Sequence, residues 1–297
     1  MKKTFLTLTM GMALATSMVM TSCGEKKQSA EQAEASGEKT EAPAGKAKAQ
    51  KPADLKVYKS ADLQAQMAND AANVGFDESV ISTVDAMMEN NKAVKAVYFD
   101  HKINMIGTAS FKNCPNLEAV YFDEAVDVIG DEAFMGCTSL KEVKVTTSTL
   151  GLNAFDGCTS LEKVLLDQQG WKIRDNALAN CPALKTIIIP MTIDAIEEDA
   201  FKGSAGIEEL AIPYNFKDRM YTFCSASKNI KKIYILTPAL YQFPTTAAAK
   251  AFNKAQCEAY VPDALIKEFQ GDETWSGFAA IKPLSESGYF NADSTIK

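Results

Sequence analysis

The stretch Ala133-Phe134-Met135-Gly136-Cys137-Thr138-Ser139-Leu140 recurs along the chain, and its recurrence decides the fold. Residues 154–161 repeat it as Ala-Phe-Asp-Gly-Cys-Thr-Ser-Leu, and looser copies lie at 109–117, 177–184 and 200–207. Self-similarity at a period of roughly 20–50 residues is the signature of repeat architectures. The sequence therefore predicts a solenoid.

Each copy ends on an aliphatic anchor that begins a short alternating pattern. The anchors are Val94, Leu117, Leu140, Leu161, Leu184, Ile207 and Ile230, spaced 23, 23, 21, 23, 23 and 23 residues apart. Apolar residues follow at the third and fifth positions, as at Val143 and Val145. This alternation is typical of a strand with one buried face. Because one repeat cannot bury its own apolar face, we expect stacked repeats whose strands form a parallel sheet.

The pattern A-F-x-x-C-x-x-L-x-x-V-x-L, from Val94 to Ile235, resembles the BspA-like branch of bacterial leucine-rich repeats. Ala259-Tyr260-Val261-Pro262, followed by Trp275 and Phe278, resembles the closing cap of that family. The resemblance covers about two thirds of the chain and implies an α/β leucine-rich-repeat solenoid with a curved parallel sheet. It implies little about function, because a fold does not determine a partner.

The N-terminus resembles a lipoprotein signal. Lys2 and Lys3 precede an apolar stretch that ends in Thr21-Ser22-Cys23. The resemblance implies a signal peptide over residues 1–22, a lipid on Cys23 that attaches the chain to a membrane, and, because Gly24 follows, no retention in the inner membrane. The run Glu25-Lys26-Lys27 resembles the charged export tags of bacterial surface lipoproteins, which implies an outer-membrane location on the cell surface. Two alternatives remain open: an ordinary secretory peptide with Cys23 incidental, and a lipoprotein on the periplasmic face.

Three further segments flank or contain the repeats. Residues 23–56 are mostly small or charged, which predicts a disordered tether, with a charged Ala-rich helix as the alternative. Residues 57–92 place apolar residues at near-helical spacing and predict a helical N-terminal cap; the alternative is a separate small helical domain. We assign residues 93–256 to the solenoid and 257–297 to the C-terminal cap and tail.

Stacking turns sequence columns into spatial ladders. The residue after each anchor alternates in charge, which predicts a device that fixes the register: Lys95, Glu118, Lys141, Glu162, Lys185, Glu208 and Lys231. Cys114, Cys137, Cys158 and Cys181 form another column, which we expect to hold buried free thiols; disulfides are the alternative. Cys224 and Cys257 lie outside the column and receive no role.

A third column predicts a binding face. The residue between the two buried positions of each strand points to the open side of the sheet: Tyr98, Tyr121, Lys144, Leu165, Ile188, Ala211 and Tyr234. Most of these side chains are aromatic or aliphatic, and an exposed apolar stripe indicates an interaction surface for a protein or a glycan. Two alternatives remain: β-propensity alone selected these residues, or residues 58–91 fold over them.

No set of residues predicts catalysis. His101 is the only histidine, and we expect it in a solvated turn after the first strand. No phosphate-binding glycine loop or metal-binding motif occurs, so we expect no enzyme, no cofactor and no metal. A net charge of −7 without a basic block disfavours nucleic acid. We expect a monomeric binding or adhesion module; the alternative is a structural or assembly component of the envelope that faces the periplasm.

Overall fold

The computed structural model describes residues 51–64, 71–167, 172–189, 193–214, 229–243, 253–292 and 294–296. The predictions for the signal peptide, the lipid on Cys23, the tether up to residue 50 and Cys224 lie outside these residues. Among the described residues, none forms a helix with the length and apolar character needed to cross a membrane.

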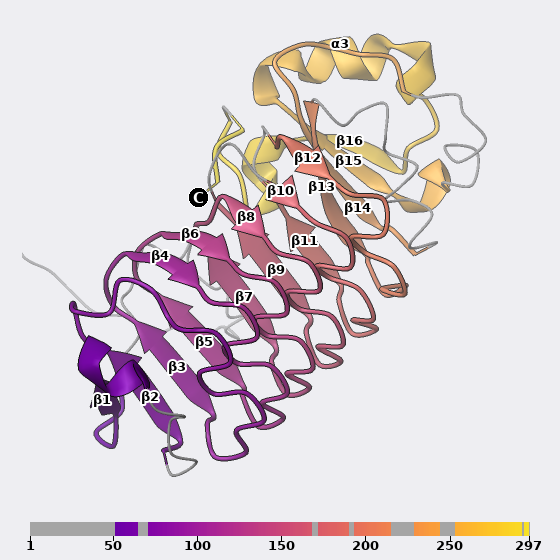
Figure 1. Cartoon of the computed structure of the whole chain (residues 1–297). Coiled ribbons are helices and arrows are strands. Elements are labelled where there is room, and N and C mark those ends of the chain that lie inside the picture. The colour runs from indigo at the N-terminus through magenta and orange to yellow at the C-terminus, as the bar shows by residue number, and fades with distance from the viewer. Residues whose placement is uncertain are drawn as a thin grey trace, which may run out of the picture. The chain divides into compact units, whose positions relative to one another are not determined.

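The main sheet is built from parallel strands in the order of the sequence (Figure 1). Its first part contains β1 (Lys56–Tyr58), β2 (Asn73–Phe76), β3 (Ala96–Phe99) and β5 (Ala119–Phe122). Its second part contains β7 (Glu142–Val145), β9 (Lys163–Leu166), β11 (Thr186–Ile188), β13 (Glu209–Pro213), β14 (Lys232–Leu236), β15 (Glu258–Val261) and β16 (Ala280–Pro283). The two parts meet where the Lys141 amide donates to the Glu118 carbonyl at 3.4 Å. The parallel solenoid predicted from the repeats is confirmed.

A second, five-stranded parallel sheet lines another side of the coils. It contains β4 (Ile103–Ile106), β6 (Val126–Ile129), β8 (Thr149–Leu150), β10 (Lys172–Ile173) and β12 (Ala195–Ile196). Figure 1 shows this row alongside the main sheet, so that the coils that contain these five strands pass through both sheets. The inward residues, such as Ile106, Ile129 and Leu150, are fully buried between the two sheets.

The A-F-x-x-C segments form a third side made of stacked turns. The Phe111 amide donates to the Ala133 carbonyl and the Phe134 amide to the Ala154 carbonyl, both at 2.8 Å. The rings of Phe111 and Phe134 stack with centroids 5.2 Å apart. The residue before each cysteine has a positive φ, 56° at Asn113 and 72° at Gly136, which explains why asparagine or glycine occupies this column.

The cysteine column lies inside these turns. Cys114, Cys137, Cys158 and Cys181 are buried free thiols, as predicted. Each thiol donates to a carbonyl of the preceding coil at 3.1–3.3 Å, and the hydroxyl of Ser204 makes the same contact with Leu178 at 2.7 Å. Burial raises the pKa of Cys181 to about 12. The column therefore contributes small donors that join neighbouring coils.

The helical N-terminal cap predicted for residues 57–92 is wrong. The described part of this segment contains β1, β2 and the short 3-10 helix η1 (Ser60–Gln64). Residues 86–91 then make the same turn as later coils, because the Met88 amide donates to the Ser110 carbonyl at 2.7 Å. The first coils therefore belong to the solenoid. Residues 51–56, assigned above to the tether, also pack against it.

The C-terminal segment adds two more coils and one short helix. Between β15 and β16 lie η4 (Asp263–Leu265), α3 (Ile266–Gly271) and η5 (Glu273–Trp275); η3 (Lys254–Gln256) precedes β15 and η6 (Leu284–Ser287) follows β16. Phe269 and Trp275 are fully buried, and the indole N–H of Trp275 donates to the Tyr241 carbonyl at 2.6 Å. The prediction that these aromatic residues close this end of the stack agrees with their burial, although only α3 is α-helical among the described residues.

Candidate functional site on the outer face of the main sheet

The strand register brings the predicted binding column together. We call it the outer row: Gly75, Tyr98, Tyr121, Lys144, Leu165, Ile188, Ala211, Tyr234, Tyr260 and Lys282. Neighbouring members pair in register on adjacent strands, about 4.8 Å apart, from Gly75 to Tyr121, from Lys144 to Ile188 and from Ala211 to Lys282. Tyr121 and Lys144 lie on β5 and β7, which the Lys141–Glu118 hydrogen bond joins, and Ile188 and Ala211 lie on the paired strands β11 and β13. The outer row therefore runs along the face of the sheet that is turned away from the core.

Exposure divides the outer row into three parts. Tyr121 is 40% exposed, Lys144 is exposed and Leu165 is half-buried. Tyr98 is buried, and Ile188, Ala211 and Tyr234 have no exposed surface at all. The expectation that the whole column from Tyr98 to Tyr234 is exposed is therefore wrong, and within that column only the middle, from Tyr121 to Leu165, is open.

The C-terminal tail covers the far part of the row. The ring of Tyr234 lies 5.6 Å from the rings of both Tyr289 and Phe290, and Phe290 is fully buried. The Nζ atom of Lys163, on β9, lies 5.5 Å from the centre of the Tyr289 ring. The yellow C-terminal segment in Figure 1 accordingly runs back beside the middle of the stack. We considered residues 58–91 as a cover for this column, but the far part of the row is covered by the C-terminal tail instead.

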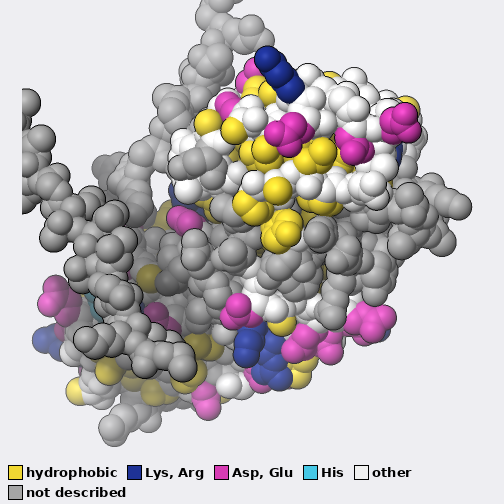
Figure 2. Space-filling model, turned by 90° about the horizontal axis from the view of Figure 1, so that it is seen from above, with side chains coloured by type: hydrophobic (Ala, Val, Ile, Leu, Met, Phe, Trp, Pro, Cys, Tyr) yellow, Lys and Arg dark blue, Asp and Glu magenta, His cyan; other side chains and the backbone are white. Residues whose placement is uncertain are grey.

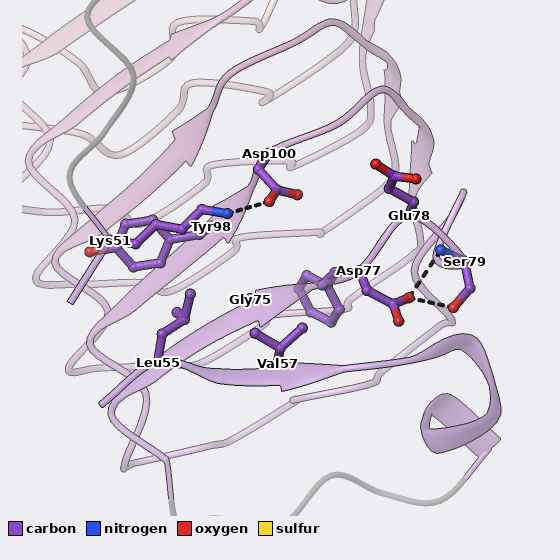
Figure 3. A pocket seen from close by; sticks show the side chains of 10 residues that line it. Lys51, Leu55, Val57, Gly75, Asp77, Glu78, Ser79, Tyr98 and Asp100 are labelled. Atoms are coloured by element: carbon purple, nitrogen blue, oxygen red, sulfur yellow. Dashed lines mark hydrogen bonds and ion pairs between the residues drawn. The ribbon is translucent and has the colours of Figure 1, made fainter. Parts of the chain in front are cut away.

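The N-terminal segment covers the near part of the row. Leu55 lies over Gly75 so closely that a Cβ atom there would meet its side chain at 3.2 Å. Lys51 reaches across to form an ion pair with Asp100 (Figure 3). A hollow of about 390 Å³ remains beside Tyr98, with Val57, Asp77 and Ser79 among its lining residues.

The polar groups around this hollow are engaged with one another, and Asp100 among them binds Lys51 of the N-terminal segment. Nδ1 of His101 lies 2.9 Å from Asp100, and Nε2 lies 2.8 Å from the Val80 carbonyl oxygen. Burial alone would lower the pKa of His101, but these two hydrogen bonds and the charges of Asp100 and Glu78 together raise it. With 14% of its side chain exposed, His101 is not the solvated turn residue we expected. Asp77 accepts a hydrogen bond from the amide of Ser79. These polar groups therefore have structural partners within the protein.

Charges beside the outer row are mostly paired across strands. The pairs are Lys163–Glu142 at 3.6 Å, Lys232–Glu209 at 2.8 Å and Lys282–Glu258 at 2.6 Å. Lys231 and Glu208, which belong to the predicted column of alternating charges, also pair, at 2.9 Å. On the face shown in Figure 2 the two signs of charge are interspersed. Within the described residues, no group of three or more His, Cys, Asp or Glu side chains is arranged to hold a metal ion.

Comparison with known families agrees with this geometry. A model of the BspA type leucine-rich repeat region matches residues 67–162 and 142–254, with six copies. The chain belongs to this BspA-type family. No curated protein matches the sequence. The family match begins at residue 67, inside the segment that we expected to be helical, which agrees with the extra coils found there.

Several bacterial leucine-rich repeat structures are similar to this BspA-type chain. One from Eubacterium ventriosum is 27% identical over 45% of this chain and 37% of its own, with a TM-score of 0.41. One from Bacteroides ovatus is 20% identical over 63% and 44%, with a TM-score of 0.37. A leucine rich cell surface protein from Faecalibacterium prausnitzii is 15% identical over 83% and 87%, with a TM-score of 0.31. The chain spans less than half the length of the first two.

Proposed function

We propose that this BspA-type protein is a lipid-anchored cell-surface module that binds a protein or glycan on the open middle of the outer row. The observation that carries the proposal is the ring of Tyr121, which is 40% exposed while it stacks on Tyr98 at 4.7 Å and 19°. A tyrosine already fixed by stacking loses little further freedom when a partner binds, and it offers both apolar area and a polar tip. Lys144 and Leu165 extend this surface along the sheet.

The rest of the molecule supports a binding role. Membership of a repeat family, in which stacked coils present an extended face, favours a recognition module over an enzyme. Asp100 and His101, beside the hollow at Tyr98, are already engaged, since Asp100 pairs with Lys51 of the N-terminal segment and His101 contacts Asp100. The interspersed charges near the outer row favour a partner recognised by shape and apolar contact over a polyanion such as nucleic acid.

Exchange of Tyr121 tests the site. The mature protein, solubilised in detergent, is used to capture partners from extracts of cells or secretions that the bacterium meets. We expect Tyr121→Ser combined with Lys144→Ala to reduce capture at least tenfold. Met105→Ser is the matched control, because Met105 is also 40% exposed but lies on the second sheet. Equal loss with the control, or no loss with the double variant, would contradict the assignment.

Exchange of Cys23 tests the anchor. Cys23→Ala removes the sulfur to which the proposed lipid is attached, so the protein should move from the detergent phase to the aqueous phase on phase separation. Unchanged partition would contradict the lipid attachment. Brief protease treatment of intact cells separates the two possible orientations, since a chain that faces the periplasm is shielded and survives.

A further inference from the structure

The C-terminal tail, residues 288–292 and 294–296, places Tyr289 and Phe290 on the outer row. Gly288 has a φ of 81°, a conformation that glycine adopts readily, and it turns the chain after η6. Phe290 then becomes fully buried, and Tyr289 packs beside it against Tyr234. Three residues of the row, Ile188, Ala211 and Tyr234, lose all their exposure in this region.

The tail is held differently from the strands beneath it. Its backbone hydrogen bonds close on itself: the Asn291 amide donates to the Thr295 carbonyl at 2.8 Å, and the Ser294 amide donates to the Asn291 carbonyl at 3.1 Å. The hydroxyl of Ser287 accepts from the amides of Tyr289 and Phe290 at 3.2 and 3.0 Å. The contacts of Tyr289 and Phe290 with the sheet are made by their side chains. The tail can therefore leave without breaking a hydrogen bond between strands.

The covered surface has the chemistry of a site for aromatic side chains. The Tyr234 ring meets Tyr289 edge-on at 77° and Phe290 at 49°, geometries that aromatic pairs favour. Lys163 places its ammonium group over the Tyr289 ring. Burial, with a further contribution from the carboxylate of Glu209, raises the pKa of Tyr289 to about 12. The surface thus accommodates the phenyl ring of Phe290 at one position and the hydroxyl-bearing ring of Tyr289 at the neighbouring position.

The covered site is continuous with the open one. Ile188, at its edge, pairs in register with Leu165, which pairs with Lys144 of the open middle. Departure of the tail would uncover Tyr234 and so extend the open middle, Tyr121, Lys144 and Leu165, along the sheet as a mostly apolar strip. Contiguous apolar strips of this kind on soluble proteins mark interaction sites.

We propose that the outer row recognises a polypeptide segment with two adjacent aromatic residues, and that the C-terminal tail occupies this site until such a segment displaces it. The inference rests on the proposed function and narrows its partner from a protein or glycan to a polypeptide. The seated tail is the argument for this chemistry, because it shows which side chains the surface accommodates.

The tail itself supplies the probe. A labelled peptide of residues 285–297, Ser-Glu-Ser-Gly-Tyr-Phe-Asn-Ala-Asp-Ser-Thr-Ile-Lys, is titrated against the full chain and against a chain that ends at Ser287, with fluorescence anisotropy as the readout. A tethered tail acts at an effective concentration of about millimolar, so it excludes weaker competitors. We expect the shortened chain to bind the peptide at least tenfold more tightly than the full chain. A Phe290→Ser peptide should lose this binding.

A full-length variant keeps the test decisive if the shortened chain does not fold. Phe290→Ser in the full chain removes the buried ring but leaves the chain length unchanged, and it should also raise affinity for the wild-type peptide at least tenfold. A folded shortened chain or a folded Phe290→Ser chain that gains no affinity would overturn the proposal. A full chain that forms a dimer, lost on shortening, would also overturn it, because a second copy would then be the partner.

The outcome is separable from that of the proposed function. If capture still depends on Tyr121 while the peptide fails to bind, only the inference about the tail is refuted. If the peptide binds while capture is insensitive to Tyr121, the open middle of the row is not the site of capture.

Discussion

Replacement of Leu140 by alanine should destabilise the middle of the solenoid by about 3–5 kcal/mol. Leu140 is an anchor of the repeat and has no exposed surface, so its whole side chain is lost from a close-packed core. Three carbon groups at about 0.8 kcal/mol each give roughly 2.4 kcal/mol for transfer alone. The cavity left between two hydrogen-bonded coils adds the remainder, because strands at fixed spacing cannot collapse around it.

The effect should be local as well as large. Coils contact mainly their neighbours, so hydrogen exchange should accelerate most in β5, β7 and β9 and least in β15 and β16. Denaturant unfolding measures the total loss, and exchange measured by mass spectrometry gives its distribution. Lys144→Ala, on the opposite face of the adjoining strand, is the matched control and should cost less than about 0.5 kcal/mol. A loss below about 1 kcal/mol at Leu140, or uniform exchange along the chain, would refute the stacked-core account.

Other features of the structure lead to three further predictions. Both ring nitrogens of His101 face hydrogen-bond acceptors, and its pKa is raised in the folded protein. The protonated ring should therefore stabilise the fold fully below a pH of about 6.5, and this stabilisation should disappear as the pH rises through the folded pKa. His101→Gln should flatten this part of the pH–stability curve. The thiols of Cys114, Cys137, Cys158 and Cys181 should resist a thiol reagent until the protein unfolds, and rapid labelling of the native chain would show that the column is open to solvent. Cys158→Ser should be tolerated within about 2 kcal/mol, since Ser204 makes the same bond in the next but one coil; calorimetry would expose a larger loss.

Strict periodicity made the central coils predictable from the sequence. The strands, their parallel register and the buried thiols all follow from residues that recur every 21 or 23 positions. Where the pattern degrades, the same reasoning fails. In the first full turn Met88 and Asn91 replace the phenylalanine and the cysteine, so the remaining apolar spacing resembled that of a helix. Backbone bonds to the next coil, rather than local propensity, impose the turn there.

The exposure of the outer row depends on segments with no repeat. Successive residues of a strand point to opposite faces, so Ile187 and Ile189 face the core while Ile188, between them, faces away from it. Whether water or another segment then meets this strand is set by tertiary contacts, such as the hydrogen bond of Tyr289 with Thr186 of the same strand, more than one hundred residues apart. Local pattern carries no information about such a contact. The Gly288-Tyr289-Phe290 sequence, a flexible residue before two large rings, is the one available signal.

The ion pair of Lys51 with Asp100 also influences how the molecule unfolds under mechanical force. A pull from the N-terminal side reaches the solenoid first at this ion pair and then at β1, an outermost strand that is bonded on one side to β2. Tension applied there removes coils singly from the end, instead of loading many strands at once in shear. The first coil, 18 residues from Lys56 to its partner Val74, releases about 60 Å of chain, and the next, of 23 residues, about 80 Å, so the protein lengthens in steps. The Tyr121 surface survives the loss of the first coil, so a ligand bound there as proposed would stay attached while the molecule extends.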